Sequence, residues 1–164
     1  MKKIFSLFLT IIFIFTLSLH NNVQANEVHI PLETTVSVIY LDNGDYIETS
    51  IVTIPSLNNE ASILATNTKT GTKTSTYKNS SGEALWSVSV TGTFTYTGQS
   101  STCTSVSGTS KSYSSAWKVS ATTNSKSGNT ATAKATGTHY ILGVAVNTYA
   151  LSVTLTCSST GVLS

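Results

Sequence analysis

The sequence predicts an all-β protein: an antiparallel β-sandwich with one disulfide, preceded by a β-hairpin. The first observation is the stretch WSVSVTGTFTYT at 86–97, where odd positions are Ser or Thr and even positions are apolar or Gly. This period of two predicts a strand with one face packed inward and one hydroxyl face in water. The second is that no segment has a convincing helical period, while Gly, Ser and Asn turns separate many short strand-like runs.

A hairpin is predicted in the first part of the chain. The strand-like runs 36–41 and 46–54 flank the residues Asp-Asn-Gly-Asp at 42–45. Asn-Gly between two such runs predicts a tight turn, because both residues tolerate positive φ. An isolated hairpin is only marginally stable in water, so we expect it to dock on the rest of the protein. Residues 55–68 then read as a linker.

The remaining strands are predicted by the same alternation. The run 85–97 is long for one strand, so we expect a bend or bulge at Gly92. In 130–140 the alanines 131, 133 and 135 share one face, and in 147–157 the apolar side chains again alternate with Ser and Thr. The expected strands of this part are 72–78, 85–97, 102–107, 116–122, 130–140 and 147–157.

Residues 1–25 have the organisation of a secretory signal peptide. Lys2 and Lys3 precede an apolar run, and Val23 and Ala25 place small residues before a cleavage point after Ala25. The alternative is a membrane anchor, but the run is shorter than the ~18 apolar residues that a membrane span needs. We therefore expect a secreted, extracellular protein.

Export would place the two cysteines in an oxidising compartment. An even pair there predicts a Cys103–Cys157 disulfide, which in the chain-entropy model contributes about 4 kcal/mol. The alternatives are a metal site or a reactive thiol, and no histidines lie near the two cysteines to complete a zinc site. We expect no metal and no cofactor.

The charges separate along the chain. Six acids and no lysine lie in 26–67, whereas seven lysines and one acid, Glu83, lie from residue 68 onward. We divide the chain into the signal peptide 1–25, an acidic segment with hairpin and linker 26–68, and a basic Ser/Thr-rich β-sandwich domain 69–164. Three explanations of this charge separation stay open. It is due to chance, the acidic segment covers the basic domain, or the acidic segment is a pro-segment that is removed.

Several stretches resemble a family of small exported β-rich proteins from low-GC Gram-positive bacteria. The resemblance covers most of the chain after the signal peptide, implies secretion and a β fold, and brings no catalytic motif. The stretches are YLDNGDYIET at 40–49, ALWSVSVTGTFTYTG at 84–98, SSAWKV at 114–119, SKSGNTAT at 125–132 and VTLTC at 153–157.

A second resemblance is to the immunoglobulin pattern, through the order Cys103, Trp117, Cys157. The chain departs from it because Leu155, not Tyr, lies two residues before the second cysteine, and 158–164 leaves little room for a final strand. The resemblance therefore implies an Ig-like sandwich only in the loose architectural sense.

Catalysis is not expected. The domain 69–164 has one acid, Glu83, and one histidine, His139. A glycosidase needs two carboxylates, and a Ser-His-Asp triad needs an acid that orients its histidine. A lone histidine beside Tyr140 is more often a packed sheet residue than a base. Nucleic acid is not an expected partner either, because arginine is absent and the lysines are dispersed.

The function we predict is a secreted, non-catalytic binding or adhesion module of the bacterial cell surface. Its partner would be an anionic cell-wall polymer or a glycan, attracted by lysines and stacked on exposed aromatic rings. Core packing is the alternative for Trp86, Phe94 and Trp117. The candidate ligand-binding residues are Tyr96, Tyr113, Tyr140, Lys111, Lys118 and Lys134.

Two other functions stay open. A small membrane-acting protein, pore-forming or antibacterial, would suit Ser/Thr-rich alternating hairpins, and only this alternative brings membrane contact. Dye release from liposomes separates it from a binding module. A structural surface protein with a Lys–Asn cross-link beside Glu83 would show an intact mass that lacks one ammonia.

Overall fold

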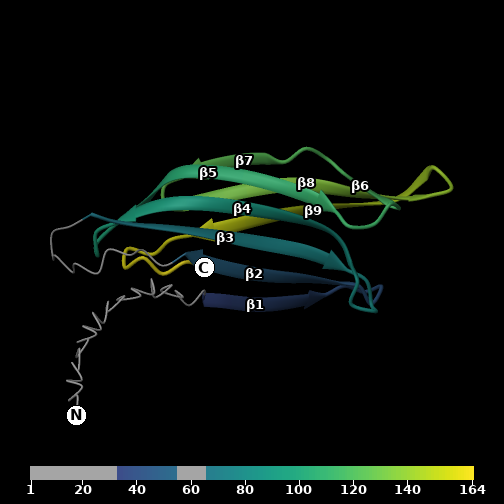
Figure 1. Ribbon diagram of the computed structural model, residues 1–164, viewed down its shortest axis with the longest axis horizontal. Coiled ribbons are helices and arrows are strands. Elements are labelled where there is room, and N and C mark those ends of the chain that lie inside the picture. Colours follow the sequence, from purple (N-terminus) through teal and green to yellow (C-terminus); the bar gives the residue numbers. More distant parts are fainter. Residues whose placement is uncertain (1–32, 55–65) are drawn as a thin grey trace, which may run out of the picture.

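The computed structural model describes residues 33–54 and 66–164, and every regular element among them is a β-strand (Figure 1). The predicted all-β class with antiparallel sheets is therefore confirmed. The predicted signal peptide and most of the predicted linker lie outside these residues. The strands are β1 (Glu33–Tyr40), β2 (Tyr46–Ile54), β3 (Asn67–Lys78), β4 (Ala84–Tyr96), β5 (Ser101–Ser112), β6 (Trp117–Val119), β7 (Thr123–Ser127), β8 (Thr130–Ile141) and β9 (Val144–Thr156).

The strands form two antiparallel sheets. The first sheet follows chain order, β1-β2-β3-β4-β5. In the second sheet β9 pairs with one edge of β8, and β6 and β7 pair with successive parts of its other edge. The sheets face each other, because β3, β4 and β5 contact β8 and β9 around one hydrophobic core.

The core is built from bulky side chains on β4 and small side chains on β8. Trp86, Val88, Val90 and Phe94 are fully buried, as the alternation of 86–97 predicts. The facing side chains of β8 include the buried alanines 131, 133 and 135. Small residues opposite large ones let the two layers interdigitate without voids.

The smallest residue of β8 meets the largest residue of β4. A Cβ atom on Gly137 would lie 2.7 Å from Trp86 Nε1, closer than real Cβ contacts come. The indole therefore occupies the space in which a side chain of residue 137 would stand.

The hydroxyl row of 86–97 faces away from the core and hydrogen-bonds across strands. Thr91 Oγ1 lies 2.8 Å from Thr72 Oγ1, and Ser89 Oγ lies 2.8 Å from Thr74 Oγ1. Comparable cross-strand pairs of Thr and Ser stabilise a sheet by roughly 0.2–1 kcal/mol each. The hydroxyl face thus takes part in sheet pairing.

The predicted hairpin is confirmed, and it docks by extending the first sheet. In the β1–β2 connection only Gly44 has a positive φ, 85°, so Asn43 does not adopt the conformation on which the tight-turn prediction relied. β2 pairs with β3 along its length, and Glu48 forms a 2.8 Å ion pair with Lys78 of β3. The boundary predicted at residue 69 falls inside β3.

The predicted disulfide is wrong, because Cys103 and Cys157 are both free thiols. Both side chains are buried, and their sulfur atoms donate to different carbonyls: Cys103 Sγ to Ser105 O at 3.2 Å and Cys157 Sγ to Ser158 O at 3.4 Å. Sequence spacing does not fix the direction of a Cβ, on which disulfide geometry depends. Burial raises the pKa of the Cys103 thiol, which disfavours the reactive thiolate.

The expected bend of the long strand is present near Gly92. The register between β4 and β5 shifts between Thr93 and Phe94. A Cβ on Gly92 would lie only 2.6 Å from the Phe94 ring. The ring therefore fits because residue 92 has no side chain and the bulge changes the path of the strand.

Gly137→Ala tests the contact between the two sheets. The added methyl must displace the rigid Trp86 indole, so we expect a loss of about 1–3 kcal/mol in the free energy of unfolding. Urea denaturation measures it. Lys134→Ala, at an exposed position of the same strand, is the control and should change stability by less than about 0.5 kcal/mol. Equal stability of Gly137→Ala and wild type would contradict this packing.

The free cysteines predict the outcome of thiol labelling. The native protein should react slowly with a thiol reagent, because both sulfur atoms are buried. After unfolding in urea without reductant, both thiols should react. Absence of labelling in the unfolded protein, together with an intact mass lower by two hydrogens, would mean that the disulfide forms.

Candidate functional site

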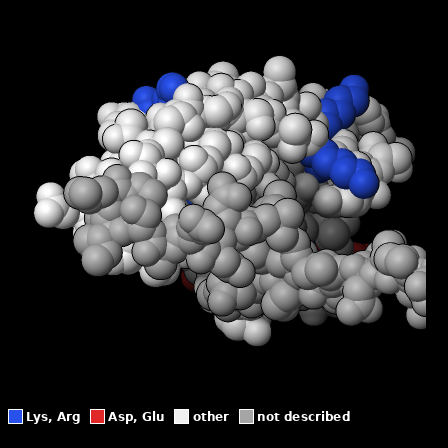
Figure 2. All heavy atoms as spheres, turned by 60° about the vertical axis from the view of Figure 1, so that its left-hand side comes forward, with Lys and Arg blue, Asp and Glu red and all other residues white. Residues whose placement is uncertain are grey.

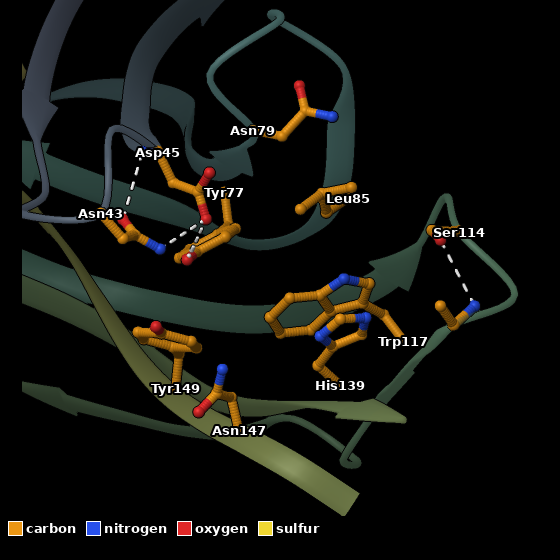
Figure 3. Close-up of a pocket in the computed structure, with 11 residues that line it drawn as sticks. Asn43, Asp45, Tyr77, Asn79, Leu85, Ser114, Trp117, His139, Asn147 and Tyr149 are labelled. Atoms are coloured by element: carbon orange, nitrogen blue, oxygen red, sulfur yellow. Dashed lines mark hydrogen bonds between the residues drawn. The ribbon is translucent and has the colours of Figure 1, made fainter. Parts of the chain in front are cut away.

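One end of the molecule, at the right of Figure 1, carries the β1–β2, β3–β4 and β8–β9 turns and the β5–β6 loop. We call it the turn end. An open pocket of about 300 Å³ lies there, with one wall from the first sheet and its turns and the other from β6, β8 and β9 (Figure 3). It is the candidate site, since it collects aromatic and polar side chains from segments far apart in sequence.

Aromatic rings form the inner part of the pocket. Tyr77 of β3 lies 5.3 Å from Trp117 of β6 and 4.9 Å from Tyr149 of β9, measured between ring centroids. The ring of His139 stacks on Trp117 at 5.1 Å with an angle of 8° between the planes. Each ring lies at an inward position of its strand, and Tyr149 and His139 stay half-buried where the pocket opens.

Polar groups lie on both walls. Asp45 Oδ2 accepts a hydrogen bond from Tyr77 Oη at 2.7 Å and one from Asn43 Nδ2 at 2.8 Å. Across the pocket lie the Asn147 amide and the His139 ring (Figure 3). Within the described part of the chain, neither of these two side chains makes a hydrogen bond, and the second oxygen of Asp45, Oδ1, accepts none. These groups are free to bind a ligand.

Asn79 also lines the pocket, but its side chain is engaged in the β3–β4 turn. Its Oδ1 accepts from the backbone N–H of Ser81 at 3.0 Å and of Glu83 at 2.9 Å, and its Nδ2 donates to the Glu83 carboxylate at 2.8 Å. Asn79 therefore holds the pocket rim in place.

The pairing of Tyr77 with Asp45 shapes the electrostatics of the site. Burial, and then the hydrogen bond to the Asp45 carboxylate, raise the pKa of Tyr77 well above its ordinary value of 10.0. Tyr77 is therefore a fixed donor to Asp45 at neutral pH. Asp45 is the only acid among the lining residues, and no lysine lines the pocket.

This arrangement suits binding of hydroxyl-rich groups. Asp45 accepts hydrogen bonds, and the amide of Asn147 and the ring of His139 can donate and accept them. A pair of carboxylates for acid–base hydrolysis is not available among the lining residues. Within the described part of the chain, no cluster of His, Cys, Asp or Glu side chains could hold a metal ion.

Four of the candidate residues from the sequence form two pairs beside the pocket. Lys111 Nζ lies 4.8 Å from the centroid of the Tyr113 ring, and Lys118 Nζ lies 4.7 Å from that of Tyr140. Lys111 is opposite Ser87 on the outer face of the first sheet, and Lys118 is on the outer face of the second. Both pairs therefore flank the turn end from outside and do not line the pocket.

The other two candidates lie elsewhere. Tyr96 packs against the core near Gly161, at the opposite end of the first sheet. Lys134 is exposed in the middle part of β8. Figure 2 shows the lysine side chains of one face at separate positions, so they do not form a single basic patch on it.

Sequence reasoning did not select the pocket residues Asp45, Tyr77, Asn147 and Tyr149. Asp45 was explained by its turn, and the two tyrosines look like ordinary core residues. A signal was present in Asn147, which by alternation lies on the same strand face as the apolar residues Tyr149 and Leu151. Pairing of β2 with β3 places Tyr77 beside Asp45, and packing of the two sheets brings β9, with Asn147 and Tyr149, against them.

Comparison with protein-family models finds no match, and neither curated proteins nor solved structures show a significant similarity to the chain. The resemblance to exported Gram-positive proteins therefore stays a prediction. The part of the chain that the structure describes contains no helix that could span a membrane.

The Tyr77–Asp45 bond predicts how stability depends on pH. Tyr77 keeps its proton longer in the folded than in the unfolded chain, so its contribution is complete below pH 10 and declines as the pH rises above 10. We expect Tyr77→Phe to be less stable than wild type at pH 8 by about 1.5–3 kcal/mol. The difference should shrink above pH 10 in urea denaturation. A constant difference across this range would contradict the assignment.

Proposed function

We propose that the protein is a secreted, non-catalytic binding module that holds a neutral, hydroxyl-rich glycan of a cell envelope in the pocket at the turn end. The observation that carries the proposal is the set of unpaired polar groups, Asp45 Oδ1, Asn147 and His139, on two facing walls beside aromatic rings. Concave sites in which a few polar groups converge beside aromatic rings are typical places for a small ligand.

The charges in the pocket favour a neutral ligand. The lining includes Asp45 and no lysine, so a phosphate or carboxylate would be repelled there. The lysines on the outer faces provide only weak attraction for an anionic polymer, because they are separated and exposed. Of the two partners that the sequence predicted, a glycan therefore has better support than an anionic wall polymer.

The proposal includes the finer fold prediction. The two sheets face each other, bulky side chains of β4 fill the core between them, and several turns gather at one end. These features are compatible with a sandwich that is Ig-like in the loose sense. In such an architecture the end turns form binding sites while the sheets stay rigid. Secretion is part of the proposal because an envelope glycan lies outside the cell. A pore-forming or antibacterial protein remains the alternative, and dye release from liposomes tests it.

Binding to purified Gram-positive walls, with and without their anionic polymers, tests the proposal over a salt series. We expect binding that survives removal of the anionic polymers and changes little with salt. Asn147→Ala and His139→Ala should each weaken it by about tenfold, since each removes one polar contact. A panel of immobilised neutral glycans then identifies the sugar.

Lys134→Ala is the matched control, because it removes a charge remote from the pocket. The proposal fails if Lys134→Ala weakens binding and the two pocket variants do not. It also fails if added salt abolishes binding to the walls, since that result would assign binding to the lysines.

A further inference from the structure

The β8–β9 turn has an unexpected residue at its tip. The turn consists of Leu142 and Gly143, with φ values of 48° and 81°. Two-residue turns with positive φ at both positions usually carry Asn-Gly, and positive φ is a rare conformation for a bulky residue such as Leu. Leu142 is also 100% exposed, so its side chain contributes no packing to the fold.

The exposed leucine belongs to an apolar group. Ile141 is 53% exposed, Val144 is 65% exposed and Val146 is 44% exposed. β9 contains no charged residue. Figure 1 shows the β8–β9 tip projecting beyond the neighbouring turns, so these side chains have no sheet opposite them. We call residues 141, 142, 144 and 146 the apolar tip.

An aromatic ring and a cation lie directly behind the apolar tip. Tyr140 precedes Ile141, and Lys118 Nζ lies over the Tyr140 ring. The exposed acids of the turn end, Asp42 and Glu83, belong to turns of the first sheet and not to this hairpin. The order of apolar tip, then tyrosine and lysine, matches the change of surroundings from acyl chains to head groups at a membrane surface.

The shape of the apolar tip also distinguishes a lipid from a protein partner. A specific protein interface buries about 800 Å² on each partner, usually as an extended patch. The projecting end of the hairpin, with four aliphatic side chains, offers much less. A fluid phase can surround such a projection, whereas a protein partner would need a matching cavity.

We propose that the apolar tip inserts into the boundary between head groups and acyl chains of a phospholipid bilayer, with Lys118 at the lipid phosphates. The proposal concerns docking at a membrane surface by one turn, and no part of the chain crosses the bilayer in it. It does not depend on a glycan in the pocket. The turn conformation disfavours leucine at position 142. Docking explains its presence, because Leu142 supplies apolar surface that is buried in the bilayer.

Leu142→Asn provides the test, because asparagine suits the positive φ while it removes the apolar side chain. The full-length chain is mixed with vesicles of phosphatidylcholine, with and without phosphatidylglycerol, and bound protein is separated by flotation. We expect wild type to bind, more strongly with phosphatidylglycerol. Leu142→Asn should bind about tenfold more weakly and unfold at the same or a higher temperature.

Val162→Asn is the matched control, since Val162 is 61% exposed in a turn remote from the apolar tip and should bind vesicles like wild type. All variants carry the same N-terminal residues, so a difference between them reports on the substituted turn. The proposal is overturned if wild type does not bind, or if Leu142→Asn binds equally well. It is also overturned if Leu142→Asn dissociates a dimer in lipid-free solution, which would assign the apolar tip to a second copy of the chain.

Discussion

Trp86 of β4 fills the space above Gly137 of β8, where any side chain would meet the indole. The same indole lies 6.2 Å from Tyr77 and 6.3 Å from Trp117, measured between ring centroids, and both of these rings reach the pocket. The position of the pocket floor thus depends on how closely the sheets approach at one glycine. Trp86 Nε1 is buried without a hydrogen-bond partner in the described part of the chain, at a cost of roughly 1–3 kcal/mol. Close packing of the ring in the core offsets this cost. Trp86 therefore stabilises the fold by filling space and not by hydrogen bonding.

Only 10% of the residues are charged, so the hydroxyl faces provide much of the polar surface that keeps the protein hydrated. Thr and Ser on the outer face can bond to water and to one another, and pairs such as Thr70–Thr93 at 3.0 Å do so across strands. β-branched threonine also suits an extended backbone. The composition therefore favours rigid sheets with polar outer faces, and leaves distinctive chemistry to the turns.

Periodicity was enough to predict most of the strands, the inward face of 86–97 and the hairpin around Asn43-Gly44. These features depend on residues close in sequence, for which side-chain alternation and turn preference decide the outcome. Periodicity missed β7 (Thr123–Ser127), because all five residues of this strand are exposed and polar and show no alternation. The disulfide prediction was wrong because it depends on the direction of two side chains that belong to separate parts of the fold. The pocket was missed for the same reason: Asp45 and Tyr149 come from opposite ends of the described chain, and the packing of one sheet on the other brings them to one place. The candidate lysines were chosen by charge alone, and charge does not indicate which face of a strand a residue occupies.

The β8–β9 hairpin passes through three surroundings. At Ala131 and Ala133 it packs under β4 and β5, and at His139 and Asn147 it faces the open pocket. Beyond the register shift at His139/Tyr140, the hairpin ends in the apolar tip, where the first sheet has ended. Alternation along the strands therefore places the core and pocket residues, while the register shift and the end of the opposite sheet leave the tip residues exposed. A hairpin that extends past its partner sheet is a simple way to add exposed surface to a rigid fold, because the paired strands hold it without a second core.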